Sequence, residues 1–339
     1  MTRFQQAVLG VALGFAAMAP LGAQQTKFRG FADFKFRAAG DRSDPSHFEL
    51  GQLDLFVTSK LSERMSFLSE VVGEFGGGEF GADLERIQLT LGLSNRFDAI
   101  VGRHHNPIGY WNEAHHHGSL FDPTIDRPLA LRFEDDGGVL PIHVNGAALA
   151  GHDLTALHLG FKVLVANGLG STAVRDNNGA KSVTLSVTSQ LTSRLRVGMS
   201  AYSDRLSAGT PTPSGTPLDR DLRFGLVSGF LHYEDGRTEA TAEIFRTRSA
   251  PEREPAAWGT LGYAYFGIRF GELTPYSRVD LYRVGTGDGY LEPDRLTAGL
   301  VGFRVDLSAV AVAKFEIGRE SSRLHGGRNE VRAQLAFGF

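Results

Sequence analysis

The chain has 339 residues, a formal net charge of −3 and no cysteine. Without thiols it cannot form a disulfide scaffold, a thiolate metal site or a cysteine nucleophile. A charge this close to neutral does not indicate a nucleic-acid partner.

The first 23 residues have the pattern of a secretory signal peptide. Arg3 supplies a short basic region, residues 7–21 are apolar and uncharged, and Ala23 is a suitable cleavage position. The apolar run is too short to span a bilayer, and no later run is long and apolar enough to form a membrane helix. We therefore expect a signal peptide over residues 1–23, with a mature N-terminal helix as the alternative.

The rest of the chain alternates apolar and polar residues over many short segments, which predicts strands with one face against lipid and one against water. In residues 28–38 the even positions are apolar or small and the odd positions are mostly charged, with Phe31 as the exception. In residues 222–226 we expect the apolar face toward lipid and Arg223 toward the lumen. The same alternation recurs in two further segments, 86–93 and 182–188.

Connections of two kinds separate these segments. Short polar turns repeat one five-residue pattern at 61–65, 93–97 and 191–195, with a weaker relative at 307–310. Eight longer connections are rich in Gly, Pro and charge: 40–46, 76–83, 106–138, 168–180, 206–220, 249–257, 285–294 and 320–328. This asymmetry implies about sixteen strands. With an even number of strands, both termini lie at the end of the barrel that carries the short turns, which is the periplasmic end. Residues 24–339 are thus predicted to form one all-β domain, a transmembrane antiparallel β-barrel.

The end of the chain continues the same alternation. Residues 331–339 have an apolar residue at every second position, up to the terminal Phe339. A soluble sandwich could also end on such a strand, but a terminal aromatic residue fits a membrane interface better. The pattern resembles the C-terminal strands of Gram-negative outer-membrane barrels. The resemblance implies that the assembly machinery of the outer membrane recognises the terminal aromatic residue.

The longest irregular segment, residues 104–138, is the third of the long loops. Just before and within it, residues 102–109 read GRHHNPIG, which resembles a signature of porins of the phosphate-selective type. The resemblance implies an outer-membrane porin, a water-filled channel for passive diffusion of small hydrophilic solutes or ions. In many porins the third loop folds into the barrel, so we expect residues 104–138 to constrict the channel.

The densest charges in and beside this loop are candidates for the narrowest part of the channel. Opposite charges facing each other across a pore create a transverse field that orients polar solutes. A solvated loop tip with internal ion pairs is the alternative. Over the whole chain, nearly equal numbers of basic and acidic residues are expected inside, which predicts weak ion selectivity. The candidates are Arg103, Arg127 and Arg132 on one side and Glu134, Asp135 and Asp136 on the other.

Three consecutive histidines in the loop, His115, His116 and His117, could supply imidazole ligands to a divalent metal. The alternative is that they are solvated or bonded to nearby backbone, since their spacing matches no known structural metal site. A closed or partner-binding outer-membrane barrel, with or without such a metal, is therefore the second functional hypothesis.

No nucleophile with a base and an orienting partner stands out, so we expect neither an enzyme nor a cofactor. The mature chain also has no room for the plug domain of an energy-coupled transporter. The expected partners are outer-membrane lipid and small hydrophilic solutes or ions. We expect no nucleic acid and leave a homotrimer open.

Overall fold

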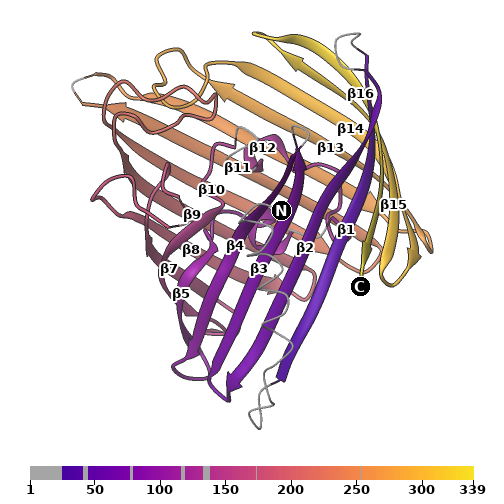
Figure 1. Ribbon diagram of the computed structural model, residues 1–339, viewed down its shortest axis with the longest axis horizontal. Helices are drawn as coiled ribbons and strands as arrows, with labels where there is room; N and C mark the ends of the chain where they lie inside the picture. Colours follow the sequence, from indigo (N-terminus) through magenta and orange to yellow (C-terminus); the bar gives the residue numbers. More distant parts are fainter. Residues whose placement is uncertain are drawn as a thin grey trace, which may run out of the picture.

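The computed structural model describes residues 25–40, 45–76, 79–115, 119–132, 138–172, 174–252 and 254–339. The expected signal peptide, residues 1–23, lies outside the described residues. Sixteen antiparallel strands close into one barrel, in which the first strand pairs with the last (Figure 1). The predicted all-β barrel of about sixteen strands is therefore confirmed.

The strands vary in length around the barrel, and those from β5 to β7 are the shortest. Two short helices, α2 (Trp111–Ala114) and η2 (Leu129–Leu131), lie between β5 and β6. Among the described residues, no helix is long and apolar enough to cross a membrane. In chain order the strands are β1 (Gln25–Ala39), β2 (His47–Ser62), β3 (Met65–Gly76), β4 (Glu79–Gly92), β5 (Phe97–His105), β6 (His143–Gly151), β7 (Gly160–Ala166), β8 (Ser182–Thr192), β9 (Leu195–Leu206), β10 (Leu222–Glu234), β11 (Thr238–Pro251), β12 (Ala257–Ile268), β13 (Leu273–Val284), β14 (Arg295–Ser308), β15 (Ala311–Ser322) and β16 (Gly326–Gly338).

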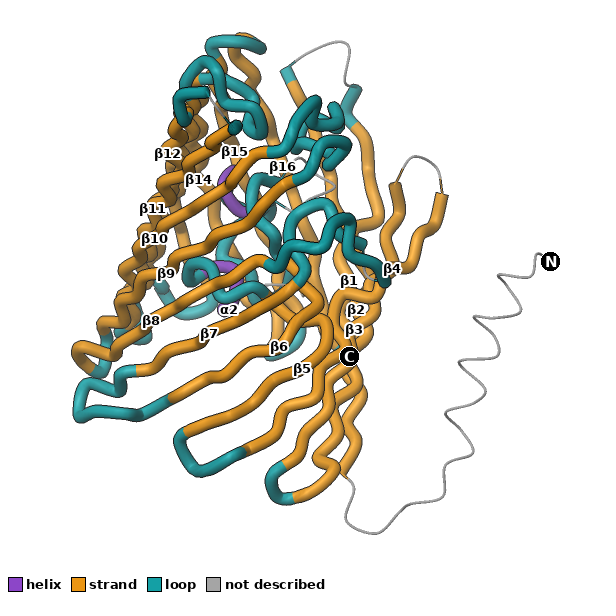
Figure 2. The backbone as a smooth tube through the Cα atoms, turned by 90° about the vertical axis from the view of Figure 1, so that its left-hand side faces the viewer, coloured by secondary structure: helices purple, strands orange, loops and turns teal. Residues whose placement is uncertain are grey.

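The two ends of the barrel differ in their connections (Figure 2). The four predicted polar turns each join an even-numbered strand to the next strand and so share one end, which we call the turn end. The eight predicted long connections each follow an odd-numbered strand and share the other end, the loop end. Three of them are shorter than predicted because strand pairing continues farther, up to Gly76 opposite Glu79, Ser322 opposite Gly326 and Pro251 opposite Leu222.

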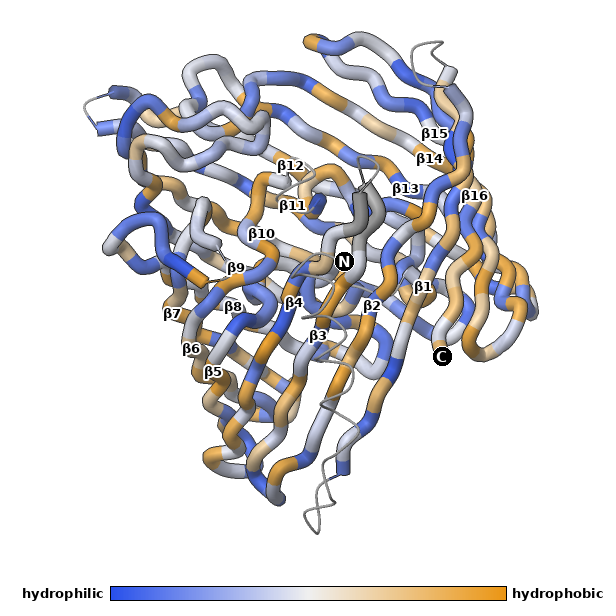
Figure 3. Tube along the Cα trace, in the orientation of Figure 1, coloured by the Kyte–Doolittle hydropathy of each residue, from blue (hydrophilic) through white to orange (hydrophobic). Residues whose placement is uncertain are grey.

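Hydrophobic and hydrophilic residues alternate along many strands in Figure 3. Since successive side chains of a strand point to opposite faces, this alternation separates the two surfaces of the barrel wall. On β16, Leu335 and Phe337 are exposed on the outside, whereas Arg332 and Gln334 are buried on the inside. An apolar outer surface around a polar interior is the arrangement of a membrane barrel, and a soluble barrel would have the opposite one.

The strand β10 departs from the predicted orientation. The apolar face of residues 222–226 was expected toward lipid, but its three apolar side chains are almost fully buried inside the barrel. Arg223, expected in the lumen, is exposed on the outside. The inward side chains belong to one apolar cluster with Ile108 and Trp111 of the third loop. Burial against this loop therefore decides the orientation of β10, and the alternation alone could not.

The barrel closes through the last residue of the chain. Gly30 and Phe339 exchange two backbone hydrogen bonds of 2.9 Å, and Ala32 lies opposite Phe337. The Phe339 ring covers Gly30, where an added Cβ would lie 2.3 Å from a ring atom. The terminal aromatic residue thus packs on the seam between the first and last strands.

Candidate functional site in the lumen

We call the connection between β5 and β6, residues 106–142, the third loop. Its described residues, 106–115, 119–132 and 138–142, lie inside the barrel. Its helix α2 is enclosed by the strands in Figure 2. Side chains from β8, β9 and β11 hold the beginning of the loop. Side chains from β1 and from β13 to β16 hold its middle part. The loop therefore extends across the lumen from one wall to the other.

Two glycines of the 102–109 motif occupy positions that only glycine suits, Gly102 in β5 and Gly109 near the start of the third loop. Gly109 has a φ of 78°, and a Cβ there would lie 2.3 Å from Glu243 Oε2. Gly102 has a φ of 120°, and a Cβ there would lie 2.1 Å from the carbonyl oxygen of Ile87. Glycine alone tolerates both the backbone conformation and the close approach at these positions.

Glu243 of β11 fixes the loop directly after Gly109. Its carboxylate accepts hydrogen bonds from the backbone amides of Tyr110 and Trp111, both at 2.7 Å. It also accepts one from the Tyr263 hydroxyl at 2.6 Å. Glu243 is buried, and a buried carboxylate is costly unless donors surround it. Glu243 is therefore an anchor for the loop and not a charge that solutes meet.

An apolar cluster fills the space between the third loop and the wall from β9 to β14. Trp111 is fully buried, and its ring meets Tyr263 edge-on with 5.6 Å between ring centres. The cluster joins Trp111 and Leu131 of the loop to Phe224 and Phe245 of the wall. Packing therefore closes this side of the lumen.

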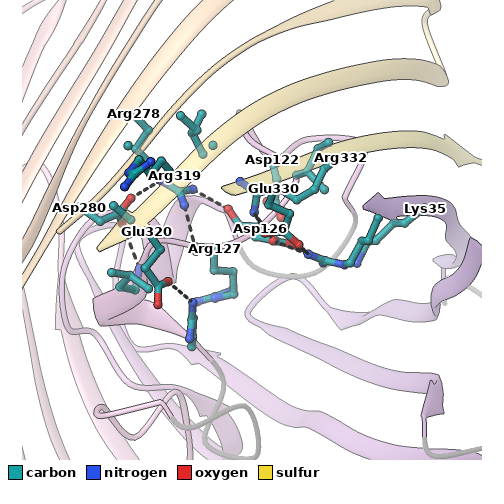
Figure 4. Close-up of a pocket in the computed structure, with 18 of the residues that line it drawn as sticks. Lys35, Asp122, Asp126, Arg127, Arg278, Asp280, Arg319, Glu320, Glu330 and Arg332 are labelled. Carbon is teal, nitrogen blue, oxygen red and sulfur yellow. Dashed lines mark hydrogen bonds and ion pairs between the residues drawn. The ribbon is translucent and has the colours of Figure 1, made fainter. Parts of the chain in front are cut away.

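On the opposite side, charges hold the loop, and Asp126 lies at their centre (Figure 4). Arg37 of β1 donates to the two oxygens of Asp126 at 2.6 and 2.9 Å, and Arg332 of β16 forms a further ion pair with it. Burial alone would raise the pKa of Asp126. The two guanidinium groups outweigh burial and hold this pKa well below its ordinary value, so Asp126 stays ionised in mild acid.

Two other strands hold the same stretch of loop. Arg278 of β13 donates to the Thr124 hydroxyl and to the carbonyl oxygen of Asp126, both at 2.5 Å. Glu316 of β15 accepts a hydrogen bond of 2.8 Å from the backbone amide of Ile125. Because these contacts come from separate strands, they fix the edge of the loop relative to the wall.

A cavity of about 490 Å³ lies between this edge of the loop and the wall of β1 and β13 to β16 (Figure 4). Its acidic lining residues are Asp122, Asp126, Asp280, Glu320 and Glu330. Basic lining residues are more numerous: Lys35, Arg37, Arg127, Arg132, Arg278, Arg319, Arg328 and Arg332. Among the described residues the lining is thus net positive, which favours anions in this part of the lumen.

Asp122 is the acid of this lining with a pKa near neutrality. It is buried, and burial raises its pKa to about 6 against the opposing effect of Lys314, Arg127 and Lys35. The nearby Asp33 adds to the rise. Asp122 is therefore ionised at pH 7 and mostly neutral at pH 5.

The structure brings together two of the predicted constriction residues. Arg127 and Arg132 both line the cavity, and Arg132 lies 3.7 Å from Glu320 across it. Arg103 does not join them, because its guanidinium donates to the carbonyl oxygen of Leu84 at 2.9 Å. The other three candidates lie outside the described residues: Glu134, Asp135 and Asp136.

Of the three histidines considered as metal ligands, only His115 is described. Its ring lies 4.9 Å from that of Trp111 and 5.7 Å from that of Tyr110, and burial lowers its pKa to about 3. His116 and His117 lie outside the described residues. The described part of the chain contains no group of three or more side chains that could hold a metal ion.

The barrel is similar to solved outer-membrane porins and channels. An anion-selective porin from Comamonas acidovorans is 13% identical over 93% of this chain and 100% of its own, with a TM-score of 0.68. OmpT of Vibrio cholerae, an outer-membrane protein, is 11% identical over 95% and 100%, with a TM-score of 0.67. The outer-membrane channel DcaP of Acinetobacter baumannii is 11% identical over 95% and 99%, with a TM-score of 0.63. The chain therefore has the fold of bacterial outer-membrane porins.

No family model matches the sequence, and the search of curated proteins found no match.

Proposed function

We propose that this chain is an outer-membrane porin, a passive diffusion channel for small hydrophilic solutes or ions that is narrowed by its third loop. The observation that carries the proposal is the charged cavity between the loop and the wall of β1 and β13 to β16. A channel needs a polar path along which the solute binds each site weakly enough to dissociate from it again. The half-buried ion pairs of Asp126 support such a path, because they keep the loop against the wall.

The constriction in this proposal lies at that cavity. Arg127 and Arg132 line it on the side of the loop, and Glu320 and Glu330 line it on the side of the wall. The excess of basic lining residues supports a moderate preference for anions. One structural neighbour is itself an anion-selective porin. Since the third loop contains no lysine, we propose small anions in general and not phosphate alone.

The rest of the chain completes this proposal. Residues 1–23 act as the export signal, and residues 24–339 form the barrel. The proposal requires no catalytic residue and no cofactor. We also propose a homotrimer, which the trimer form of OmpT from Vibrio cholerae supports by analogy.

Conductance of the purified protein in a planar bilayer tests the proposed function. We expect stepwise ionic currents and, in a salt gradient, a reversal potential of the sign that indicates anion preference. A barrel that inserts, judged by heat-modifiable migration in gels, but passes no current would contradict the proposal. That result would favour the closed or partner-binding barrel.

The anion preference should increase as the pH falls from 7 to 5. Asp122 has a pKa of about 6, above its ordinary value, so it loses its negative charge in this interval and leaves the lining more positive. A carboxyl with a raised pKa also stabilises the fold below its ordinary pKa and loses this contribution as the pH rises through 6. Acidification should therefore not release the loop.

Reversal potentials measured at several pH values check this expectation. The Asp122→Asn variant should have at pH 7 the selectivity of the wild type at pH 5, and it should change little with pH. If the variant keeps the full pH dependence of the wild type, another group is responsible.

A further inference from the structure

Five arginines project from the outer surface of the barrel near its loop end: Arg223, Arg246, Arg248, Arg283 and Arg295. We call them the arginine belt. They lie on β10, β11, β13 and β14, and all are exposed. Each lies on the outward face of its strand, which turns apolar toward the middle of the wall at Val227, Ile244, Val279 and Val301. The belt therefore marks the edge of the lipid-facing surface that lies toward the loop end.

The arginine belt has no acidic partners among the described residues, where no carboxylate forms an ion pair with any of its members. Other arginines at the loop end are neutralised, such as Arg205 by Asp221 at 3.2 Å. Moreover, Arg283 lies directly opposite Arg295 in the β13–β14 pair. Like charges directly opposite each other destabilise a sheet, so this arrangement calls for anions from outside the chain.

An aromatic side chain organises the centre of the belt. The guanidinium groups of Arg246 and Arg248 lie 5.1 and 5.9 Å from the ring centre of Trp258 on β12. Arg246 also donates to the Thr260 hydroxyl at 2.6 Å. Tryptophan is favoured at the level of lipid headgroups. The ring thus holds two cations close together at the depth where phosphate groups of lipids lie.

Directly below these cations, toward the turn end, the outer wall forms an apolar groove. Met199, Leu231 and Ile244 are among its lining residues. Its floor includes Gly229, where an added Cβ would have no neighbour closer than 3.9 Å. Ile244 is two residues from Arg246 along the same face of β11, so the groove begins where the belt ends.

We propose that the arginine belt and this groove together bind a phosphate-bearing lipid, with its phosphate groups on Arg246 and Arg248 and an acyl chain along the groove. Arginine suits phosphate because its planar fork makes paired, charge-assisted hydrogen bonds. A cationic site joined to an apolar groove matches a lipid, which carries both groups in one molecule. A second copy of the chain would need outward carboxylates to match the belt. The proposal does not depend on whether the lumen conducts.

Native mass spectrometry of the detergent-solubilised, full-length barrel tests this inference. The probes are lipid A and the same lipid A after enzymatic removal of its phosphates. We expect the wild type to retain phosphorylated lipid A, and the double variant Arg246→Gln, Arg248→Gln to bind it at least about ten-fold more weakly. The control Arg220→Gln, Arg269→Gln removes the same charge from exposed arginines that have carboxylate partners, and it should bind like the wild type.

Each other outcome is decisive. Equal binding of dephosphorylated lipid A, or equal loss in the control, would overturn the proposal. So would full competition by inorganic phosphate, which would indicate a site for free anions. If the double variant loses a multimeric state but still binds the lipid, the belt mediates contacts between copies of the chain. Gly229→Leu, which fills the groove and leaves the arginines intact, should also weaken lipid binding, and conductance should be unchanged in all these variants.

Discussion

Replacing residues 112–125 by a short Gly-Ser linker is expected to raise the single-channel conductance about two-fold, because the described residues of this segment, 112–115 and 119–125, occupy space in the lumen. The segment supplies Thr124 and Ile125, whose contacts with Arg278 and Glu316 hold the loop against the wall. Without them Asp126 should also leave its arginines. No strand pair includes the segment, so the barrel should still form.

Recordings in planar bilayers measure this effect, and heat-modifiable migration in gels verifies that the barrel is intact. The control deletion is residues 211–216, the mostly exposed tip of the connection between β9 and β10. It shortens a loop without opening the lumen and should leave conductance unchanged. If the linker variant conducts like the wild type, the third loop does not limit the current.

The substitution Glu243→Ala is expected to detach the start of the third loop from the wall. It leaves the amides of Tyr110 and Trp111 and the hydroxyl of Tyr263 without their acceptor. Each buried donor left unpaired costs about 1–3 kcal/mol, so the loop should fluctuate and the current should become noisy, with frequent partial closures. Thermal unfolding should also begin at a lower temperature.

Two further variants sharpen this test. Glu243→Gln keeps one acceptor oxygen and should give an intermediate phenotype. Thr247→Val lies on the same inward face of β11, and the described residues offer its hydroxyl no hydrogen-bond partner, so it should behave like the wild type. Quiet, wild-type currents in Glu243→Ala would show that other contacts suffice to hold the loop.

The path of the third loop could not be predicted from local sequence patterns. Asp126 meets Arg37, which is 89 residues away, and Arg332, which is 206 residues away. Nothing in the periodicity near Asp126 marks it as their partner. The apolar exception Phe31 has a similar cause, because its ring packs against Phe121 of the loop at 5.1 Å. Residues that look irregular in a strand can thus be contacts of a segment folded inside.

The sequence by itself determined the barrel, its sixteen strands, the two kinds of connection and the strand that ends at Phe339. These features follow from alternation with a period of two and from short turns, both of which are local. Only the tertiary structure decided the inward apolar face of β10, the place of Arg103 outside the cavity and the gathering of charges around Asp126. Those features depend on contacts between residues that are far apart in the sequence and come together when the wall closes around the loop. Side-chain periodicity is a local pattern and does not predict such contacts.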